Sequence, residues 1–340
     1  MTPLTTNDFH IRLKKRCFCL AALLYLLLPA MAGAAPGCQA STGTGTASYG
    51  TQTSIRVNSS TQNTSIANAG VQCGGSLLNV LGAPGYIHAV VSTAKGSRLT
   101  NAAGDAIPYQ IFADQTYTYP ITPGTAMNYY NATLLNLLGL TGSNNAPLPM
   151  YFRTVTGALN LSSGTYTDTV TVNWSWSICT LISAGNLCIG PVNTGTTSSI
   201  VNISLQITND CIINAPDIRF GTAPLISAFS PVTQTISVQC TKGTSYTVGL
   251  SDGSNASGGQ RRMANGGHYI NYEIYQGTGG TTRWGSSAGQ TRASGSADVN
   301  PGAGTGNTTQ GFVYHSQILS GQATPPAGTY TDTVVISVGF

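Results

Sequence analysis

Apolar and polar residues alternate along several short segments of the chain, most clearly in 201–208 and 334–340. The apolar members are Val201, Ile203, Leu205 and Ile207 in the first segment, and Val334, Ile336, Val338 and Phe340 in the second. A period of two with β-branched residues, between Gly-Thr and Gly-Ser clusters, predicts half-buried antiparallel strands. Several such strands in each stretch of about 150 residues predict a sandwich or a barrel.

The composition favours the same all-β class. Charged residues make up 7% of the 340 residues, against about 25% in an average soluble domain. Glu, Lys and Arg are therefore too scarce to give long amphipathic helices a polar face. Hydroxyl and amide side chains supply the polarity instead, which is typical of extracellular β proteins.

Residues 1–34 have the features of a secretory signal peptide. Four cations between Arg12 and Arg16 precede an apolar run over 17–32, and Ala32-Gly33-Ala34 fits a cleavage site. The run is short for a transmembrane anchor, which is the alternative interpretation. Cleavage would leave 10 of the 14 basic and 9 of the 10 acidic residues. A chain so close to neutrality has no basic surface for nucleic acid.

The heptapeptide GTYTDTV occurs at 164–170 and again at 328–334. Other landmarks recur at similar offsets: Tyr49-Gly50 with Phe220-Gly221, Arg98-Leu99 with Arg262-Met263, residues 107–112 with 270–275, and Cys38 and Cys73 with Cys211 and Cys240. A period this long exceeds that of solenoid repeats. It indicates two copies of a whole domain.

Six cysteines lie outside the predicted signal peptide, and an even number in an exported chain predicts disulfides. Composition alone does not choose among the pairings. The repeat does, because each copy has an early cysteine and another about 30 residues later. The predicted bridges are Cys38–Cys73, Cys211–Cys240 and, closing a short loop between the domains, Cys179–Cys188.

The second copy resembles the spore coat protein U domain, which is also the subunit fold of archaic (Csu-type) chaperone–usher pili. The resemblance rests on Cys211, Phe220-Gly221, Cys240, Arg262-Met263, Tyr272-Glu273-Ile274-Tyr275, Trp284-Gly285 and the final GTYTDTV. It is looser over residues 38–178. It implies two immunoglobulin-like antiparallel β-sandwich domains, the C-terminal one incomplete. A periplasmic chaperone would hold the open groove until an adjacent subunit, joined at the outer-membrane usher, donates a strand.

We therefore divide the chain into a signal peptide (1–34), an N-terminal adhesin-type domain (35–178), a disulfide-closed linker (179–194) and a C-terminal pilin domain (195–340). The predicted strand-accepting edge is Val334, Ile336, Val338 and Phe340. Cys38 follows the predicted cleavage site so closely that no donor segment precedes it. A subunit that receives a strand but gives none is expected at the pilus tip. The expected function is attachment to abiotic or host surfaces and biofilm formation.

Two apolar segments distinguish the first copy from the second and are candidates for surface contact: a longer loop after Cys73, and a leucine-rich stretch that replaces a Gly/Ser/Thr-rich one of nearly equal length. The candidate residues are Leu77, Leu78, Val80, Leu81, Tyr129, Tyr130, Leu134, Leu135, Leu137, Leu138 and Leu140. Exposed apolar patches mark interaction sites. The alternative is that these side chains, Leu134 to Leu138 above all, form a helix turn packed in the core. The loop from Cys179 to Cys188 is a further, weaker candidate.

Other functions have weaker support. Trp174 and Trp176 could stack on sugars in a carbohydrate-binding adhesin, or lie in the core, and a ligand-free structural coat or fibre subunit is a third possibility. Ser287 matches G-x-S-x-G, but within a Gly/Ser loop rather than a strand–turn–helix. Asp168 and Asp332 are equivalent residues of separate domains, which disfavours paired-carboxylate catalysis. The histidines 88, 268 and 315 have no metal-ligand spacing. We expect no enzyme activity, metal or cofactor.

Overall fold

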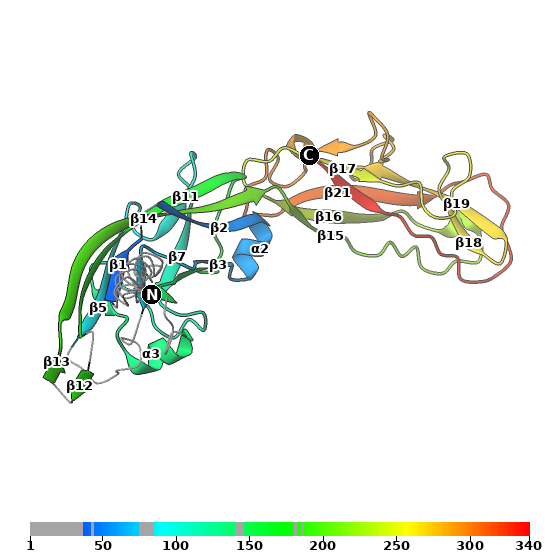
Figure 1. Cartoon of the computed structure of the whole chain (residues 1–340). Coiled ribbons are helices and arrows are strands. Elements are labelled where there is room, and N and C mark those ends of the chain that lie inside the picture. Colours follow the sequence, from blue (N-terminus) through cyan, green and yellow to red (C-terminus); the bar gives the residue numbers. More distant parts are fainter. Residues whose placement is uncertain (1–36, 42–43, 75–84, 140–145, 180–181, 185–186) are drawn as a thin grey trace, which may run out of the picture.

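The computed structural model describes residues 37–41, 44–74, 85–139, 146–179, 182–184 and 187–340. It consists of two β domains placed end to end (Figure 1). Each domain has its own cluster of buried apolar side chains. The predicted all-β, two-domain architecture is confirmed.

The first domain runs from Gly37 to Thr208. Its strands are β1 (Gly37–Ala40), β2 (Thr44–Thr53), β3 (Asn63–Ile66), β4 (Val71–Gly74), β5 (Tyr86–Thr93), β6 (Arg98–Thr100), β7 (Ala106–Phe112), β8 (Ala126–Asn128), β9 (Ala146–Pro147), β10 (Met150–Thr154), β11 (Gly164–Cys179), β12 (Ile182–Ala184), β13 (Leu187–Ile189) and β14 (Val192–Thr208). Its described residues include two short helices, α2 (Ser54–Ser59) and α3 (Ala132–Leu137). The main sheet has the order β2-β14-β11-β6-β7-β10-β3, and β1-β4-β9 form a smaller one.

The second domain follows a similar plan with eight described strands. Its strands are β15 (Cys211–Asn214), β16 (Val232–Cys240), β17 (Thr247–Leu250), β18 (Arg262–Asn265), β19 (His268–Gln276), β20 (Arg292–Ala293), β21 (Gln310–Ile318) and β22 (Ile336–Gly339), with 3-10 turns η2 (Ile226–Ala228) and η3 (Ser294–Ser296). They form two sheets, β15-β16-β21-β19-β18 and β20-β17-β22. The described residues of this domain include no counterpart of β14.

Strand β14 changes two of the predicted boundaries. It pairs with β11 over sixteen positions, from Gly164↔Ile207 to Cys179↔Val192, and its apolar face lies in the first core. Residues 195–208 therefore complete the first sandwich, although the predicted boundary at 195 assigns them to the C-terminal domain. The repeat did not show this, because the second copy has no equivalent strand.

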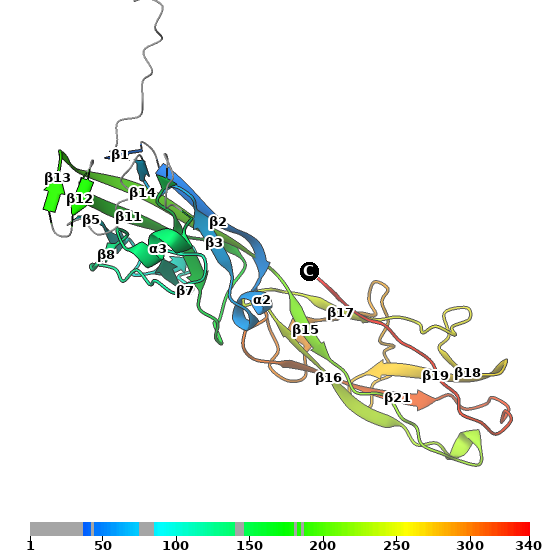
Figure 2. The same cartoon turned by 60° about the horizontal axis from the view of Figure 1, so that its bottom comes forward.

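The predicted disulfide-closed linker is also wrong, although its disulfide is present. The β12–β13 pair and the adjoining ends of β11 and β14 lie at the end of the first domain farthest from the second (Figures 1 and 2). We call this end the distal pole. All three predicted bridges, Cys38–Cys73, Cys179–Cys188 and Cys211–Cys240, are confirmed.

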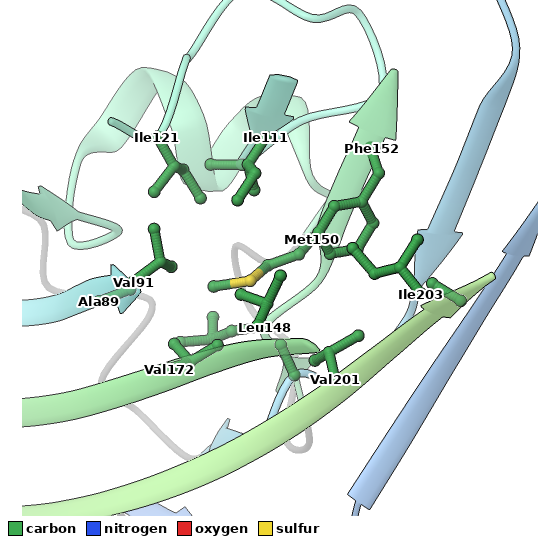
Figure 3. Packing of buried hydrophobic residues seen from close by; sticks show 14 of the residues in the cluster. Ala89, Val91, Ile111, Ile121, Leu148, Met150, Phe152, Val172, Val201 and Ile203 are labelled. Atoms are coloured by element: carbon green, nitrogen blue, oxygen red, sulfur yellow. The ribbon is translucent and has the colours of Figure 1, made fainter. Parts of the chain in front are cut away.

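The first core lies between β14 and β11 on one side and β7 and β10 on the other (Figure 3). Val201 and Ile203 of β14 face Phe152 and Met150 of β10, and these four side chains are at most 1% exposed. Their alternation along β14 is the pattern visible in the sequence. The strand is thus an integral part of the first core.

Only Asn209 and Asp210 separate β14 from β15, and both side chains accept hydrogen bonds at the joint between the domains. Asp210 accepts hydrogen bonds from Ser54 Oγ (2.7 Å) and the Ile55 amide (3.2 Å) of the first domain, and from Thr241 Oγ1 (2.9 Å) of the second. The backbone amide of Lys242 also donates to the Leu161 carbonyl (3.1 Å). The domains are therefore joined by specific contacts as well as by the chain itself.

Candidate functional site

The first domain shows what a complete sandwich looks like at the edge formed by GTYTDTV. There β14 lies between β11, to which it is antiparallel, and β2, to which it is parallel. Ile203 lies opposite Asp168, and Val201 lies opposite Val170. The strand covers Tyr166, Asp168 and Val170, which are all at most 2% exposed.

In the second domain the two corresponding segments flank an open groove of about 550 Å³. One wall is 215–220, the counterpart of β2, and the other is 330–336, the counterpart of the first half of β11. The floor is made of core side chains: Ile236, Leu250, Met263, Tyr272, Ile274 and Tyr314. Tyr330, Asp332 and Val334 are only half-buried here, whereas their counterparts are covered. The groove lies where the first domain has β14.

The wall at 330–336 also has unused backbone groups. Thr331, Thr333 and Val335 exchange hydrogen bonds with Ala264, Ser254 and Ser251 on the sheet side. Residues alternate in direction along an extended chain, so Asp332 and Val334 point their N–H and C=O groups toward the groove. Neither backbone has a hydrogen-bond partner within the described part of the chain. Such an edge is a template for strand pairing.

The predicted edge residues divide into two groups. Val334 and Ile336 line the groove and pack against the second core. Val338 packs against that core and pairs with Val248 of β17, outside the groove lining. Phe340 lies beyond β22 and is 65% exposed.

Sequence reasoning missed the opposite wall. Asp217, Ile218, Arg219 and Phe220 line the groove, yet 215–223 is not part of any strand. The correspondence of Phe220-Gly221 with Tyr49-Gly50 was the available signal. Pro216 and the adjacent charges hide any alternation of apolar and polar residues in this segment.

A tyrosine–aspartate pair supports each copy of GTYTDTV. Tyr109 Oη donates to Asp168 Oδ2 at 2.8 Å, and Tyr272 Oη donates to Asp332 Oδ2 at 2.8 Å. Burial, together with these carboxylates, raises the pKa of Tyr109 and Tyr272 above the ordinary value. Both hydroxyls therefore remain donors. Each aspartate accepts this bond within its own domain, which is consistent with a structural role rather than with paired-carboxylate catalysis.

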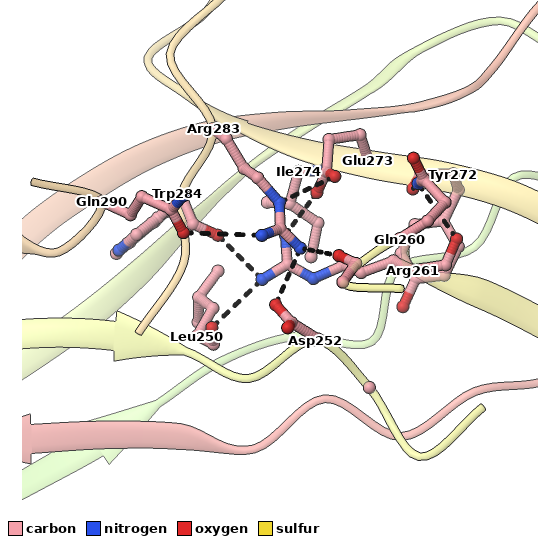
Figure 4. A network of polar contacts seen from close by, with 12 residues as sticks. Leu250, Asp252, Gln260, Arg261, Tyr272, Glu273, Ile274, Arg283, Trp284 and Gln290 are labelled. Atoms are coloured by element: carbon pink, nitrogen blue, oxygen red, sulfur yellow. Dashed lines mark hydrogen bonds and ion pairs between the residues drawn. The ribbon is translucent and has the colours of Figure 1, made fainter. Parts of the chain in front are cut away.

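A buried ionic network holds the floor of the groove in place (Figure 4). The Arg261 guanidinium is fully buried, pairs with Glu273 at 2.5 Å and donates to the carbonyls of Leu250 (3.1 Å) and Trp284 (2.8 Å). Arg283 binds the other oxygen of Glu273 at 2.8 Å. The network links β17 to β19, whose residues Leu250 and Ile274 line the groove. The floor is therefore preformed.

The surface-contact candidates have mixed positions in the structure. Tyr129, Leu134 and Leu135 are fully buried, so exposure of these three was a wrong expectation, and the alternative of a core helix holds for them. Asn131 caps this helix, α3, and its apolar side turns into the core. The other described candidates are Tyr130 and Leu138, half-buried against the core, and Leu137, 36% exposed. The remaining five, Leu77, Leu78, Val80, Leu81 and Leu140, lie outside the described residues.

The distal pole has exposed apolar residues that were not predicted. Ile189 and Val192, beside the Cys179–Cys188 bridge, are 53% and 51% exposed. Tyr86, opposite Ser177, is 37% exposed and stacks on His88. The sequence gives little indication of this patch, because each of these residues is a single apolar residue in a short strand or next to a turn.

The tryptophans are not available as a sugar-stacking platform. Trp174 is 2% exposed and donates to the Ala69 carbonyl, and Trp176 is 6% exposed and donates to Asn193 Oδ1 at 2.8 Å.

Ser287 lies in a turn closed by the Gln290 amide, with no α-helix after it. Within the described ranges, no cluster of three or more potential metal ligands occurs. No described helix is long and apolar enough to cross a bilayer.

These features define a class: β-sandwich subunits with one complete domain and one domain that lacks a strand. The chain belongs to the spore coat protein U domain family, which matches residues 25–173 and 197–337. No curated protein matches the chain significantly.

Among solved structures, the chain is similar to one in the CsuC-CsuE chaperone-tip adhesion subunit pre-assembly complex of archaic chaperone–usher Csu pili from Acinetobacter baumannii. The identity is 26%, the TM-score is 0.65, and the alignment covers 89% of this chain and 100% of the other. Two further matches are the CooA pilin subunit of enterotoxigenic Escherichia coli (14% identity, 51% and 99% covered, TM-score 0.29) and the CupB6 tip adhesin of Pseudomonas aeruginosa (10%, 89% and 94%, 0.28). Their TM-scores are too low to support an inference.

Proposed function

We propose that the protein is the tip adhesin of a chaperone–usher pilus, which attaches cells to surfaces and promotes biofilm formation. The observation that carries the proposal is the groove between 215–220 and 330–336, in a domain whose sister copy has that space filled by β14. A sandwich with an open apolar groove and unpaired backbone groups needs a strand from another chain. The groove is the receiving half of such an exchange.

The partners follow from this need. A periplasmic chaperone shields the groove first, and an adjacent subunit later donates a strand to it at the outer-membrane usher. The similar Csu chain was solved in a chaperone pre-assembly complex. Residues 1–34 direct export, and the mature protein reaches the cell surface through the periplasm. The domains are 37–208 and 211–340.

The distal pole is the contact surface of the proposed adhesin. Ile189 and Val192 are exposed there, at the end of the molecule opposite the groove-bearing domain, and Leu137 of α3 is a further exposed apolar residue of the same domain. Each leucine fully buried against an apolar surface contributes about 1.5–3 kcal/mol. A few such contacts bind abiotic surfaces with little stereochemical selectivity.

Attachment to polystyrene tests the pole directly. The test variant carries Leu137→Ser, Ile189→Ser and Val192→Ser. The matched control carries Leu225→Ser and Val299→Ser, which change residues of similar exposure (56% and 51%) in the second domain. We expect the test variant to lose attachment while keeping its melting temperature, and the control to attach normally. Equal attachment by both variants would remove the pole from the proposed function.

A further inference from the structure

The partner of β14 within the first domain contains a bulge. Ser204 pairs with Ser48, whereas Gln206 pairs with Thr51, so β2 has one more residue than β14 between these pairs. The extra length lies at Tyr49-Gly50, where Gly50 has a φ of 72°. A glycine in the left-handed region is a common way to build a bulge, because it has no Cβ to clash.

The same backbone shape exists in the second domain without a strand beside it. Gly221, the counterpart of Gly50, has a φ of 85°. Phe220, the counterpart of Tyr49, packs edge-on against Tyr272 with the ring centres 6.1 Å apart. The wall of the groove is thus already bent as β2 is bent by its bulge.

We propose that the bulge at Phe220-Gly221 and the Tyr272–Asp332 pair fix a single register for the incoming strand, and that this register copies β14. The inference rests on the proposed function, in which the groove accepts a strand from another subunit. The incoming strand runs antiparallel to 330–338 and parallel to 215–221. Its residue equivalent to Ile203 lies opposite Asp332, and its residue equivalent to Val201 lies opposite Val334.

The template also defines the chemistry of the partner segment. Val201, Ile203, Leu205 and Ile207 point inward and are at most 1% exposed, while Asn202, Ser204 and Gln206 lie between them. A slip of one residue would turn the polar set into the groove. A slip of two would place the residue equivalent to Ile203 or Ile207, rather than to Leu205, opposite the bulge at Phe220-Gly221. The groove therefore selects an alternating segment with four inward β-branched or leucine side chains in one alignment.

Asp332 opposes an apolar residue in this alignment, but its carboxylate oxygens have hydrogen-bond donors within the second domain. In the first domain Asp168 is 2% exposed opposite Ile203, with its oxygens satisfied by Tyr109 Oη and the Lys95 amide (3.0 Å). Asp332 already accepts from Tyr272 Oη and from the Asn255 amide (3.1 Å). A strand that covers Asp332 therefore leaves no buried carboxylate without donors.

Disulfide trapping tests the register. Thr169 Oγ1 donates to Asn202 Oδ1 at 3.2 Å, so this pair is adjacent on the outer face of the sheet. Its counterpart is Thr333 and the strand position equivalent to 202. The six described cysteines are all in disulfides, so a new cysteine is a free thiol. Thr331→Cys, Thr333→Cys and Val335→Cys variants of the mature chain are each mixed with a peptide of residues 197–208 that carries Asn202→Cys.

We expect the Thr333→Cys variant to form the mixed disulfide about tenfold faster than the other two, because only directly opposed positions satisfy disulfide geometry. Faster trapping at Thr331→Cys or Val335→Cys, or equal trapping at all three, overturns the inference. If this peptide fails to raise the melting temperature while other alternating peptides succeed, the register fails and strand acceptance stands. If no alternating peptide binds, the proposed function fails.

Gly221→Ala tests the bulge. Because 215–223 is unpaired, alanine there can relax to an ordinary φ, and the strand must then restore the left-handed shape. We expect peptide binding at least about fivefold weaker. The control is Gly289→Ala, at a glycine with a φ of 79°, open space around its Cβ position and no part in the groove lining. Equal binding by both variants would show that Gly221 does not set the register.

Discussion

The Asp105 carboxylate of the first domain is paired with the Lys242 ammonium group of the second. Asp105 also accepts from Ser162 Oγ (2.6 Å) and the Ser162 amide (2.8 Å), and its side chain is 6% exposed. With the Asp210 contacts, this pair closes the joint on two sides. The relative orientation of the domains is therefore fixed by side chains that can be changed without touching either core.

Removing the Lys242 charge should loosen the joint. We expect Lys242→Met to weaken the coupling between the domains by about 1 kcal/mol, since one partner is partly exposed. Small-angle scattering should show a broader range of interdomain distances. Lys95→Met is the control, because Lys95 binds Thr167 within the first domain. An unchanged scattering profile for Lys242→Met would mean that the Asp210 contacts and the backbone bond from Lys242 to Leu161 suffice to hold the joint.

The acid limb of the stability curve should depend on Asp114. Burial alone would raise the pKa of this carboxyl, but hydrogen bonds from Thr116, Tyr119 and Thr118 outweigh it and lower the pKa below 3.8. A lowered folded-state pKa contributes stability above the unfolded-state pKa of about 3.9, and that stability is lost as the pH falls through the folded-state pKa.

Asp114→Asn is therefore expected to destabilise the first domain at pH 7 and to flatten its stability profile below about pH 4. Chemical unfolding at several pH values measures both effects. Asp217→Asn is a suitable control, because Asp217 is exposed and paired only with the exposed Arg219. A profile for Asp114→Asn that is parallel to the wild type would contradict this assignment.

The leucines of α3 should divide by burial. We expect Leu134→Ala and Leu135→Ala each to reduce the free energy of unfolding by about 2–5 kcal/mol, because both side chains are fully buried. Leu137→Ala, at a 36% exposed side chain, should cost less than about 1 kcal/mol. Urea unfolding separates these cases. Similar costs at all three positions would mean that α3 packs differently from this description.

The ionic network should be sensitive to loss of one partner. Arg261→Met leaves Glu273 buried beside a single arginine and removes the donors to three carbonyls, of Leu250, Ser251 and Trp284. We expect a loss of about 3–5 kcal/mol in the second domain. Arg283→Met, at a side chain 23% exposed, should cost less. Calorimetry of both variants tests this order, and the opposite order would place the main support on Arg283.

The strand alternation predicted a sandwich or a barrel, and the repeat predicted two domains and all three disulfides. The family resemblance selected the sandwich. The alternation at 201–208 predicted a strand, but not the domain in which this strand packs. The repeat gave no guidance, because only one copy has a strand equivalent to β14. Leu134 and Leu135 show a different limit. Clustered leucines are equally compatible with a buried helix turn and an exposed loop, and only the packing of α3 against the first core decides between them.

The groove was half predicted. Val334 and Ile336 were found because they alternate, whereas the wall at 215–220 has no such pattern and becomes recognisable only beside its counterpart β2. Ile189 and Val192 were missed for a similar reason. Their exposure depends on how the hairpin turns at the Cys179–Cys188 bridge. The order of apolar and polar residues does not predict that turn.

Strand β14 runs from the distal pole to the joint, and two residues later the chain continues as β15. Tension between an anchored pole and the rest of a fibre would therefore pull along this strand. Its hydrogen bonds to β11 and β2 lie across the direction of pull, so they would be loaded together in shear rather than opened one after another. The strand that completes the first sandwich is also placed to carry mechanical force through it.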